Sequence, residues 1–154
     1  MSTFSSRAAS IWECVESAPV RPIDLERIGP GIKRLPPSYW EPRMLFSGAS
    51  DARVKELTGE FPHTVASRKS THPLFVLKTL QNLAQRVCPC STKDWGVRRY
   101  IRKGCVLHYS EKVTDRVSYL VESCSFNLPM DPAFTDSLVF LGQVPEECLE
   151  ERGT

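Results

Sequence analysis

The sequence contains no long hydrophobic run and no apolar N-terminal leader. No stretch of apolar residues approaches the roughly 20 that a helix needs to span a bilayer. The opening residues, MSTFSSRAASIWECVES, lack the apolar core of a secretion signal, because Glu13 and Glu16 interrupt it. We therefore expect a cytoplasmic protein with no membrane association.

The motifs of the best-known catalytic classes are also missing. The chain has no GxGxxG, P-loop, HExxH, GxSxG or CxxC pattern. These absences argue against the familiar nucleotide-binding, zinc-protease, hydrolase and thiol-redox classes. We accordingly expect no cofactor.

The cysteines favour buried thiols over a metal site. The chain has six cysteines, and without an export signal we expect reduced thiols in the core instead of disulfides. Cys88 and Cys90 leave one residue between them, whereas paired zinc ligands usually leave about two to four. The remaining candidate ligands are scattered along the sequence: they are Cys105, Cys124, His72 and His108. The sequence therefore predicts no metal site.

Charge is unevenly distributed along the chain, although the net charge is only +2. Residues 63–116 hold eleven basic and three acidic residues, which gives +8, and residues 117–154 hold one basic and seven acidic residues, which gives −6. A basic segment of this kind can bind a polyanion if its side chains share one face. It can equally be balanced by the acidic segment within the fold. The cluster RRYIRK at 98–103 favours RNA, because Tyr100 lies among four cations.

The composition predicts one main domain preceded by an extension. A chain of 154 residues with 41% hydrophobic residues is long enough to bury one core. Residues 7–17 carry apolar residues at helical spacing, and the proline-rich stretch 18–43 is too short for a core of its own. We expect Tyr39 and Trp40 to hold this stretch against the main body. The predicted organisation is an N-terminal helical arm and connector over 1–43, followed by a domain over 44–154.

Two segments of the main domain have helical signals. Ser50 is a predicted cap for a short helix through Leu57, with Val54 facing inward and Gly59 ending it. Residues 72–88 are ambiguous, because an apolar run after Pro73 is typical of a strand while the spacing of the later apolar residues is helical. We predict a strand at 74–78 and a short helix near 79–86, and a helical domain over 72–87 is the alternative.

The rest of the chain reads as β structure. Apolar residues alternate with polar ones over 105–110 and again over 117–121, which predicts a hairpin with its turn at 111–115. A bent strand is expected over 124–128. Residues 138–141 predict a last strand or the start of a helix, with Gly142 breaking the element and Pro145 opening a helix.

Four segments in this order resemble the spine of the MazF/PemK-like family of small SH3-like barrels, many of which cleave RNA. They are HPLFVLK at 72–78, VCPCSTK at 87–93, RVSYLVES at 116–123 and VFLGQVPEECLEE at 139–151. The resemblance implies a mainly β, SH3-like barrel with short helices. It also implies a homodimer, a partner antitoxin protein and toxin-like cleavage of single-stranded RNA without metal, in which the 2′-hydroxyl attacks the adjacent phosphorus.

The resemblance also implies site residues. Pro73 and Pro89 match the two family prolines, Ser91 takes the place of the family threonine with Thr92 after it, and His72 stands where the family has arginine. A guanidinium stabilises the charge of the transition state, and a base must take the 2′ proton. His72 can act as that base or, protonated, as a phosphate partner. The implied catalytic residues are thus His72, Ser91 and Thr92. The candidate RNA-binding residues come from the basic segment and not from the resemblance: they are Arg68, Lys69, Lys93, Arg98, Arg99, Arg102 and Lys103.

Each candidate residue has an ordinary structural alternative. A histidine before proline is typical of a surface turn, and a Ser-Thr pair at a strand end is typical of turn chemistry. His108 in an alternating segment fits a cross-strand partner. Trp95 is suited either to stacking on a base or to the edge of the core. Since His72 replaces the family arginine, a noncatalytic module on the same barrel that binds RNA or protein is the alternative function.

Overall fold

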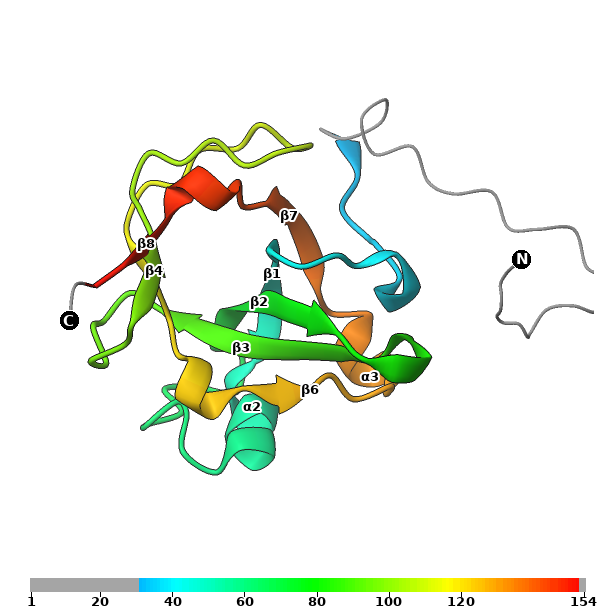
Figure 1. Cartoon of the computed structure of the whole chain (residues 1–154). Helices are drawn as coiled ribbons and strands as arrows, with labels where there is room; N and C mark the ends of the chain where they lie inside the picture. Colours follow the sequence, from blue (N-terminus) through cyan, green and yellow to red (C-terminus); the bar gives the residue numbers. More distant parts are fainter. Residues whose placement is uncertain (1–30, 153–154) are drawn as a thin grey trace, which may run out of the picture.

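The computed structural model describes residues 31–152, so the predicted helix at 7–17 lies outside the described part. The chain forms a mainly β structure in which an antiparallel sheet curls into a half-barrel with few helices (Figure 1). The strands are β1 (Met44–Ser50), β2 (Thr71–Thr79), β3 (Gln85–Ser91), β4 (Arg99–Ile101), β5 (Ser118–Leu120), β6 (Phe126–Asn127), β7 (Val139–Gln143) and β8 (Leu149–Glu151). Their order in the sheet is β7-β1-β2-β3-β5-β4-β8, and β6 also pairs with β3. The mainly β prediction is therefore confirmed.

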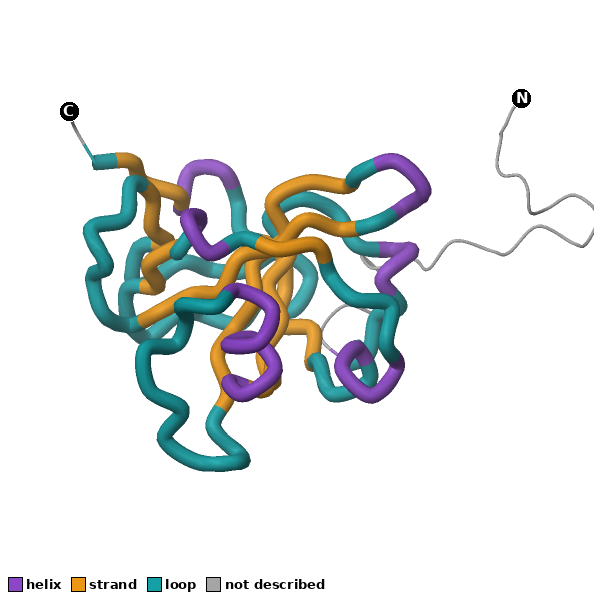
Figure 2. Tube along the Cα trace, turned by 90° about the horizontal axis from the view of Figure 1, so that it is seen from below, coloured by secondary structure: helices purple, strands orange, loops and turns teal. Residues whose placement is uncertain are grey.

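Short helices connect and cover the strands. They are α2 (Asp51–Thr58), α3 (Pro132–Thr135) and the 3-10 helices η2 (Pro37–Tyr39), η3 (Gln81–Leu83), η4 (Glu122–Cys124) and η5 (Glu146–Cys148). Figure 2 views the molecule from the side on which α2 covers the central strands. Within residues 31–152, no helix is long and apolar enough to cross a membrane.

Both faces of the central strands are buried, and each belongs to a separate apolar cluster. Paired residues on neighbouring strands share a face, so Phe46 and Leu74 enter one cluster while Leu45 and Phe75 enter the other. The first cluster packs against α2 and α3, and the second fills the inside of the curled sheet. Burial on both faces explains the continuous apolar run Leu74–Leu77, which a half-exposed strand would not show.

The ambiguous segment 72–88 forms two strands joined by one turn of 3-10 helix. β2 and β3 pair from Leu74 opposite Pro89 to Thr79 opposite Gln85, and η3 closes the hairpin. Asn82 has a positive φ of 64° within that turn, which breaks any regular helix. The predicted strand is confirmed. The short helix predicted near 79–86 is only the 3-10 turn η3, because Gln85 and Arg86 already belong to β3, and the helical domain over 72–87 is wrong.

The capping residues predicted the helix α2 correctly. The Ser50 hydroxyl accepts a hydrogen bond from the backbone N–H of Arg53 at 3.4 Å, and Gly59 ends the helix in the left-handed conformation with φ 78°. Val54 is fully buried, as predicted. The helix therefore begins and ends where its caps place it.

The connector residues 31–43 pack on the body of the domain. The Trp40 ring stacks on Phe46 with centroids 3.9 Å apart, and its indole N–H donates to the Leu35 carbonyl at 2.7 Å. This contact confirms that Trp40 holds the connector.

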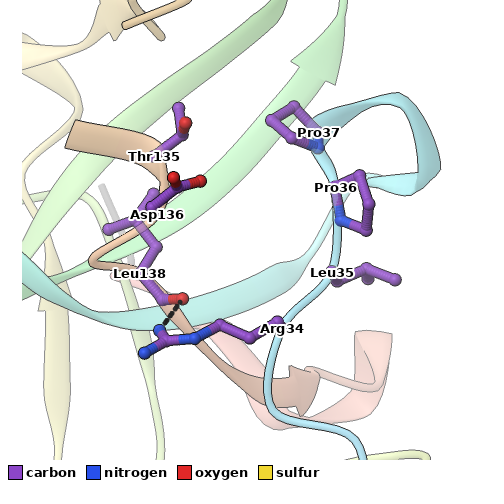
Figure 3. A pocket seen from close by; sticks show the side chains of 7 residues that line it. All are labelled: Arg34, Leu35, Pro36, Pro37, Thr135, Asp136 and Leu138. Atoms are coloured by element: carbon purple, nitrogen blue, oxygen red, sulfur yellow. Dashed lines mark hydrogen bonds between the residues drawn. The ribbon is translucent and has the colours of Figure 1, made fainter. Parts of the chain in front are cut away.

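Figure 3 shows the pocket of about 350 Å³ between the connector and the loop after α3, where Arg34 donates to the Leu138 carbonyl at 2.8 Å.

Four sequence predictions in the C-terminal half need correction, and the first two concern residues 105–128. Residues 105–110 form only isolated bridges, Val106 to Val113 and His108 to Gln143, so the predicted hairpin is wrong. Cys105 and Leu107 are nevertheless buried between exposed neighbours. The alternation of apolar and polar residues therefore reflects which side chains are buried, and does not indicate a paired strand. The predicted bent strand over 124–128 is also shorter than expected, because Cys124 belongs to η4 and only Phe126–Asn127 form β6.

Gly142 does not break the strand predicted over 138–141 but lies within β7, which β8 follows. It has φ 132°, and a Cβ at this position would lie 2.8 Å from the Leu107 Cβ and 2.7 Å from the Ser110 hydroxyl. The strand crosses the 102–117 loop closely here, and glycine permits that approach. The helix expected after Pro145 is only the 3-10 turn η5, which leads into β8.

A disulfide joins Cys105 to Cys148 across 43 residues. The expectation of reduced thiols is wrong for this pair, while Cys88, Cys90 and Cys124 are free and buried. The bond ties the irregular 102–117 segment to η5, next to the start of β8. It therefore closes the side of the half-barrel where regular strand pairing is sparse.

Candidate functional site

A small pocket lies where β2 and β3 separate. Its volume is about 180 Å³, and His72, Ser91 and Thr92 all line it, together with Ser118 of β5. The three residues that the sequence indicated as catalytic therefore share one pocket, although nineteen positions of chain separate the first two.

The strand register explains why these side chains meet. β2 and β3 pair as far as Leu74 opposite Pro89, and His72 and Ser91 each lie two residues beyond that pair. From there β3 pairs with β5, with Ser91 opposite Tyr119, while His72 is paired with Ala49 of β1. The two strands thus diverge with His72 and Ser91 on either side of the opening.

The imidazole of His72 contacts a buried carboxylate that sequence reasoning did not identify. Its Nδ1 lies 2.6 Å from Oδ1 of Asp51, and Asp51 is only 3% exposed. Asp51 is the first residue of α2, where the positive end of the helix dipole favours a negative charge. Its backbone N–H also donates to the Ser70 carbonyl at 3.0 Å, which ties the helix start to the residue before β2.

This contact determines what the histidine can do. When Nδ1 carries a proton and donates it to Asp51, Nε2 is the unprotonated nitrogen and can accept a proton. The Phe61 ring packs edge-on against the imidazole with centroids 4.8 Å apart, which further restricts the ring. With a side chain 29% exposed, His72 is held in place and still open to a ligand. An aspartate–histidine pair of this kind is the orienting part of a general-base site.

Ser91 closes the β3 side of the pocket. It is 6% exposed, and its hydroxyl oxygen accepts a hydrogen bond from the backbone N–H of Lys93 at 3.0 Å. The turn chemistry expected for Ser91 is therefore present. The same bond fixes the hydroxyl oxygen at the pocket wall, while Thr92 beside it is exposed.

Cys90 also lines the pocket, but its chemistry is suppressed. Burial raises the pKa of the Cys90 thiol far above its usual range. A thiol in that state is protonated at neutral pH and is a poor nucleophile. The imidazole and the hydroxyls are thus the groups at this site with useful chemistry.

The basic cluster at 98–103 faces acidic partners. β4 pairs with β8, and the two strands lie side by side at one end of the sheet (Figure 1). Arg99 binds both oxygens of Glu122 at 2.8 and 3.0 Å, and this bond raises the pKa of its guanidinium. Arg98 pairs with Glu151 at 2.8 Å, and Arg102 donates to the Glu147 carbonyl at 2.8 Å. The acidic C-terminal segment therefore balances this cluster within the fold.

The other predicted RNA-binding residues are exposed. Arg68 and Lys69 lie in the loop that leads into β2, Lys93 follows Ser91, and Lys103 follows β4. Of these, Lys93 lies nearest in sequence to a pocket residue, and no side-chain ion pair joins any of the four to another residue in 31–152. They remain available to contact an anion.

The described part of the chain has no group of three or more His, Cys, Asp or Glu side chains placed to hold a metal ion. Comparisons of the chain with protein-family models, with curated proteins and with solved structures find no match. The resemblance to MazF/PemK-like proteins therefore stays a prediction from sequence motifs, and the site geometry stands on its own.

Proposed function

We propose that the protein is a metal-independent endoribonuclease of the MazF/PemK type, or a diverged relative, built on an SH3-like barrel. The observation that carries the proposal is the 2.6 Å contact between His72 and the buried Asp51, beside a pocket whose lining includes the hydroxyl side chains of Ser91 and Thr92. A base fixed by a carboxylate is what removal of the 2′ proton requires. A homodimer and an antitoxin protein belong to the same proposal.

In this mechanism, Nε2 of His72 takes the proton of an RNA 2′-hydroxyl. The 2′ oxygen forms a bond to the adjacent phosphorus while the bond from phosphorus to the 5′ oxygen breaks. The leaving 5′ oxygen takes a proton from solvent, and the products end in a 2′,3′-cyclic phosphate and a 5′-hydroxyl. The Ser91 and Thr92 hydroxyls donate to the nonbridging oxygens, where negative charge gathers in the transition state.

The mechanism needs a cation that the family supplies as arginine. His72 does not replace a permanent guanidinium in that role. Arg68, Lys69 and Lys93 are the exposed cations nearest to the pocket residues in sequence. Arg98 and Arg99 would contribute to phosphate binding only after leaving their carboxylate partners, and Arg102 only after leaving the Glu147 carbonyl.

The test is incubation of the purified protein with a long labelled RNA in EDTA, beside the double variant H72A/S91A. Discrete fragments from the wild type alone support cleavage at this pocket. Intact RNA that is still bound favours the alternative, a noncatalytic RNA-binding module. If the protein neither cleaves nor binds RNA, both RNA functions are contradicted, and binding of a protein partner is the remaining alternative. Size-exclusion chromatography with light scattering tests the homodimer separately.

A further inference from the structure

Trp95 is a large aromatic side chain left partly exposed in the turn between β3 and β4. It is 37% exposed, although an indole usually buries most of its surface in a domain of this size. It follows the pocket residues Ser91 and Thr92 by only a few positions. The proposed reaction gives this residue no role.

Aromatic contacts connect Trp95 to the pocket. Its ring packs on Phe61 with centroids 5.1 Å apart, and Phe61 packs on His72 with centroids 4.8 Å apart. The Trp95 and His72 rings are therefore no more than about 10 Å apart. His63 also stacks on Trp95, at 5.4 Å and with planes inclined by 27°.

The turn that carries Trp95 is held in one conformation. Asp94, immediately before it, accepts a hydrogen bond from the Gly96 N–H at 2.8 Å and forms an ion pair with Arg152. The hydrogen bond from Arg152, followed by that from the Gly96 N–H, lowers the pKa of the Asp94 carboxyl. A ring that is already ordered loses little conformational entropy when it binds a flat partner.

We propose that Trp95, backed by His63 and Phe61, is the stacking platform for the base of the nucleotide next to the scissile phosphate. The inference rests on the proposed function for the identity of the substrate as single-stranded RNA. A paired base has no free face, so stacking here selects unpaired RNA. Lys93 is exposed and lies between Ser91 and Trp95 in the sequence, so it is the cation nearest to the platform along the chain. Stacking tolerates every base, so this platform favours single strands without reading their sequence.

The experiment measures binding of the full chain to short oligonucleotides made of 2′-O-methyl RNA, which lack the attacking hydroxyl and cannot be cleaved. A single abasic site is moved along the oligonucleotide. We expect one position at which the abasic site weakens binding by about 5- to 150-fold, the range for loss of one stacked base. W95A should weaken binding of the intact oligonucleotide by a similar factor and be insensitive to the abasic site at that position.

Two variants separate stacking from folding. W95F keeps an aromatic ring and should restore most of the binding, while M130A removes another exposed apolar side chain and should change nothing. If W95A fails to fold, the abasic scan can still test the stacking platform, because it can be carried out with the wild type and with W95F. A wild type equally sensitive to abasic sites at all positions, or W95A that keeps the position-specific loss, would overturn the inference.

Failure of the platform can be told apart from failure of the nuclease. A position-specific abasic effect without cleavage of ordinary RNA retains the platform and rejects the nuclease. Cleavage by W95A at the wild-type rate, together with unchanged binding, retains the nuclease and rejects the platform.

Discussion

Two regions of the sheet carry the groups that the sequence analysis assigned to RNA binding or cleavage, and they are built differently. Where β2 and β3 diverge, a buried aspartate holds a partly exposed histidine beside a pocket lined by hydroxyl side chains. Along β4, the arginines that form the densest basic cluster in the sequence are bound to acidic groups of β8 and η4 and to a carbonyl of η5. A local cluster of cations therefore does not by itself make a binding surface, because the partner strand decides which charges remain free.

The largest expected effect concerns His72 and tests the first of these two regions. H72A should lower the cleavage rate by about 10²- to 10⁴-fold, because the general base is lost. Binding to noncleavable RNA should change little. H108A, which removes an exposed histidine outside the pocket, is the matched control, and equal losses in both variants would contradict the assignment of the base.

Loss of the disulfide should have the next largest effect, and it falls on stability. In the loop-entropy account, closing 43 residues is worth about 2–4 kcal/mol of unfolding free energy. The double variant C105S/C148S should therefore unfold at lower denaturant concentration than the oxidised wild type. A reducing agent should destabilise the wild type by a similar amount and leave the variant unchanged. No difference between oxidised and reduced protein would show that the bond does not constrain the half-barrel.

Asp51 should act through His72, so its effect on cleavage should be smaller. D51N keeps a hydrogen-bond acceptor for Nδ1 but removes the carboxylate that holds the imidazole in place. We expect cleavage to fall by no more than the roughly 10²- to 10⁴-fold that loss of the base itself would cause, because the base remains and only its orientation is lost. Binding to noncleavable RNA should change little, which separates a loss of orientation from a loss of the fold. E56Q, an exposed carboxylate on the same helix, should behave as wild type.

The smallest effect should come from releasing Arg99 on β4, in the second of the two regions. E122Q removes the charge from the partner of Arg99, a pair about one third exposed that contributes at most about 1 kcal/mol to stability. RNA binding should become slightly tighter and its slope with salt steeper by up to about one ion. E146Q makes the same change in net charge without a side-chain ion pair in the structure. Equal effects of the two variants would show that total charge, and not a freed arginine, controls binding.

The sequence predicted features that depend on neighbouring residues. Ser50 and Gly59 were enough to define α2, because capping is decided within one turn of the helix. The apolar run after Pro73 was enough to define β2. The order of the pocket residues along two strands placed His72, Ser91 and Thr92 together once the strands were paired.

Features that depend on distant partners were not predictable from the sequence. An aspartate at the first position of a helix is common, so nothing local distinguished Asp51 from a residue that only favours the helix dipole. The pairing of Cys105 with Cys148 depends on how the 102–117 segment folds over η5. The neutralisation of Arg98 and Arg99 likewise depends on β8 and η4, far along the chain.

The central claim is that His72 removes a proton from an RNA 2′-hydroxyl. The most direct measurement compares an oligoribonucleotide that the protein cuts at one site with the same molecule carrying a single 2′-deoxy sugar at that site, both in EDTA. The account predicts cleavage of the first to a 2′,3′-cyclic phosphate and no cleavage of the second at that site. Cleavage of the deoxy-substituted molecule at the same bond, or products with a 5′-phosphate, would contradict it.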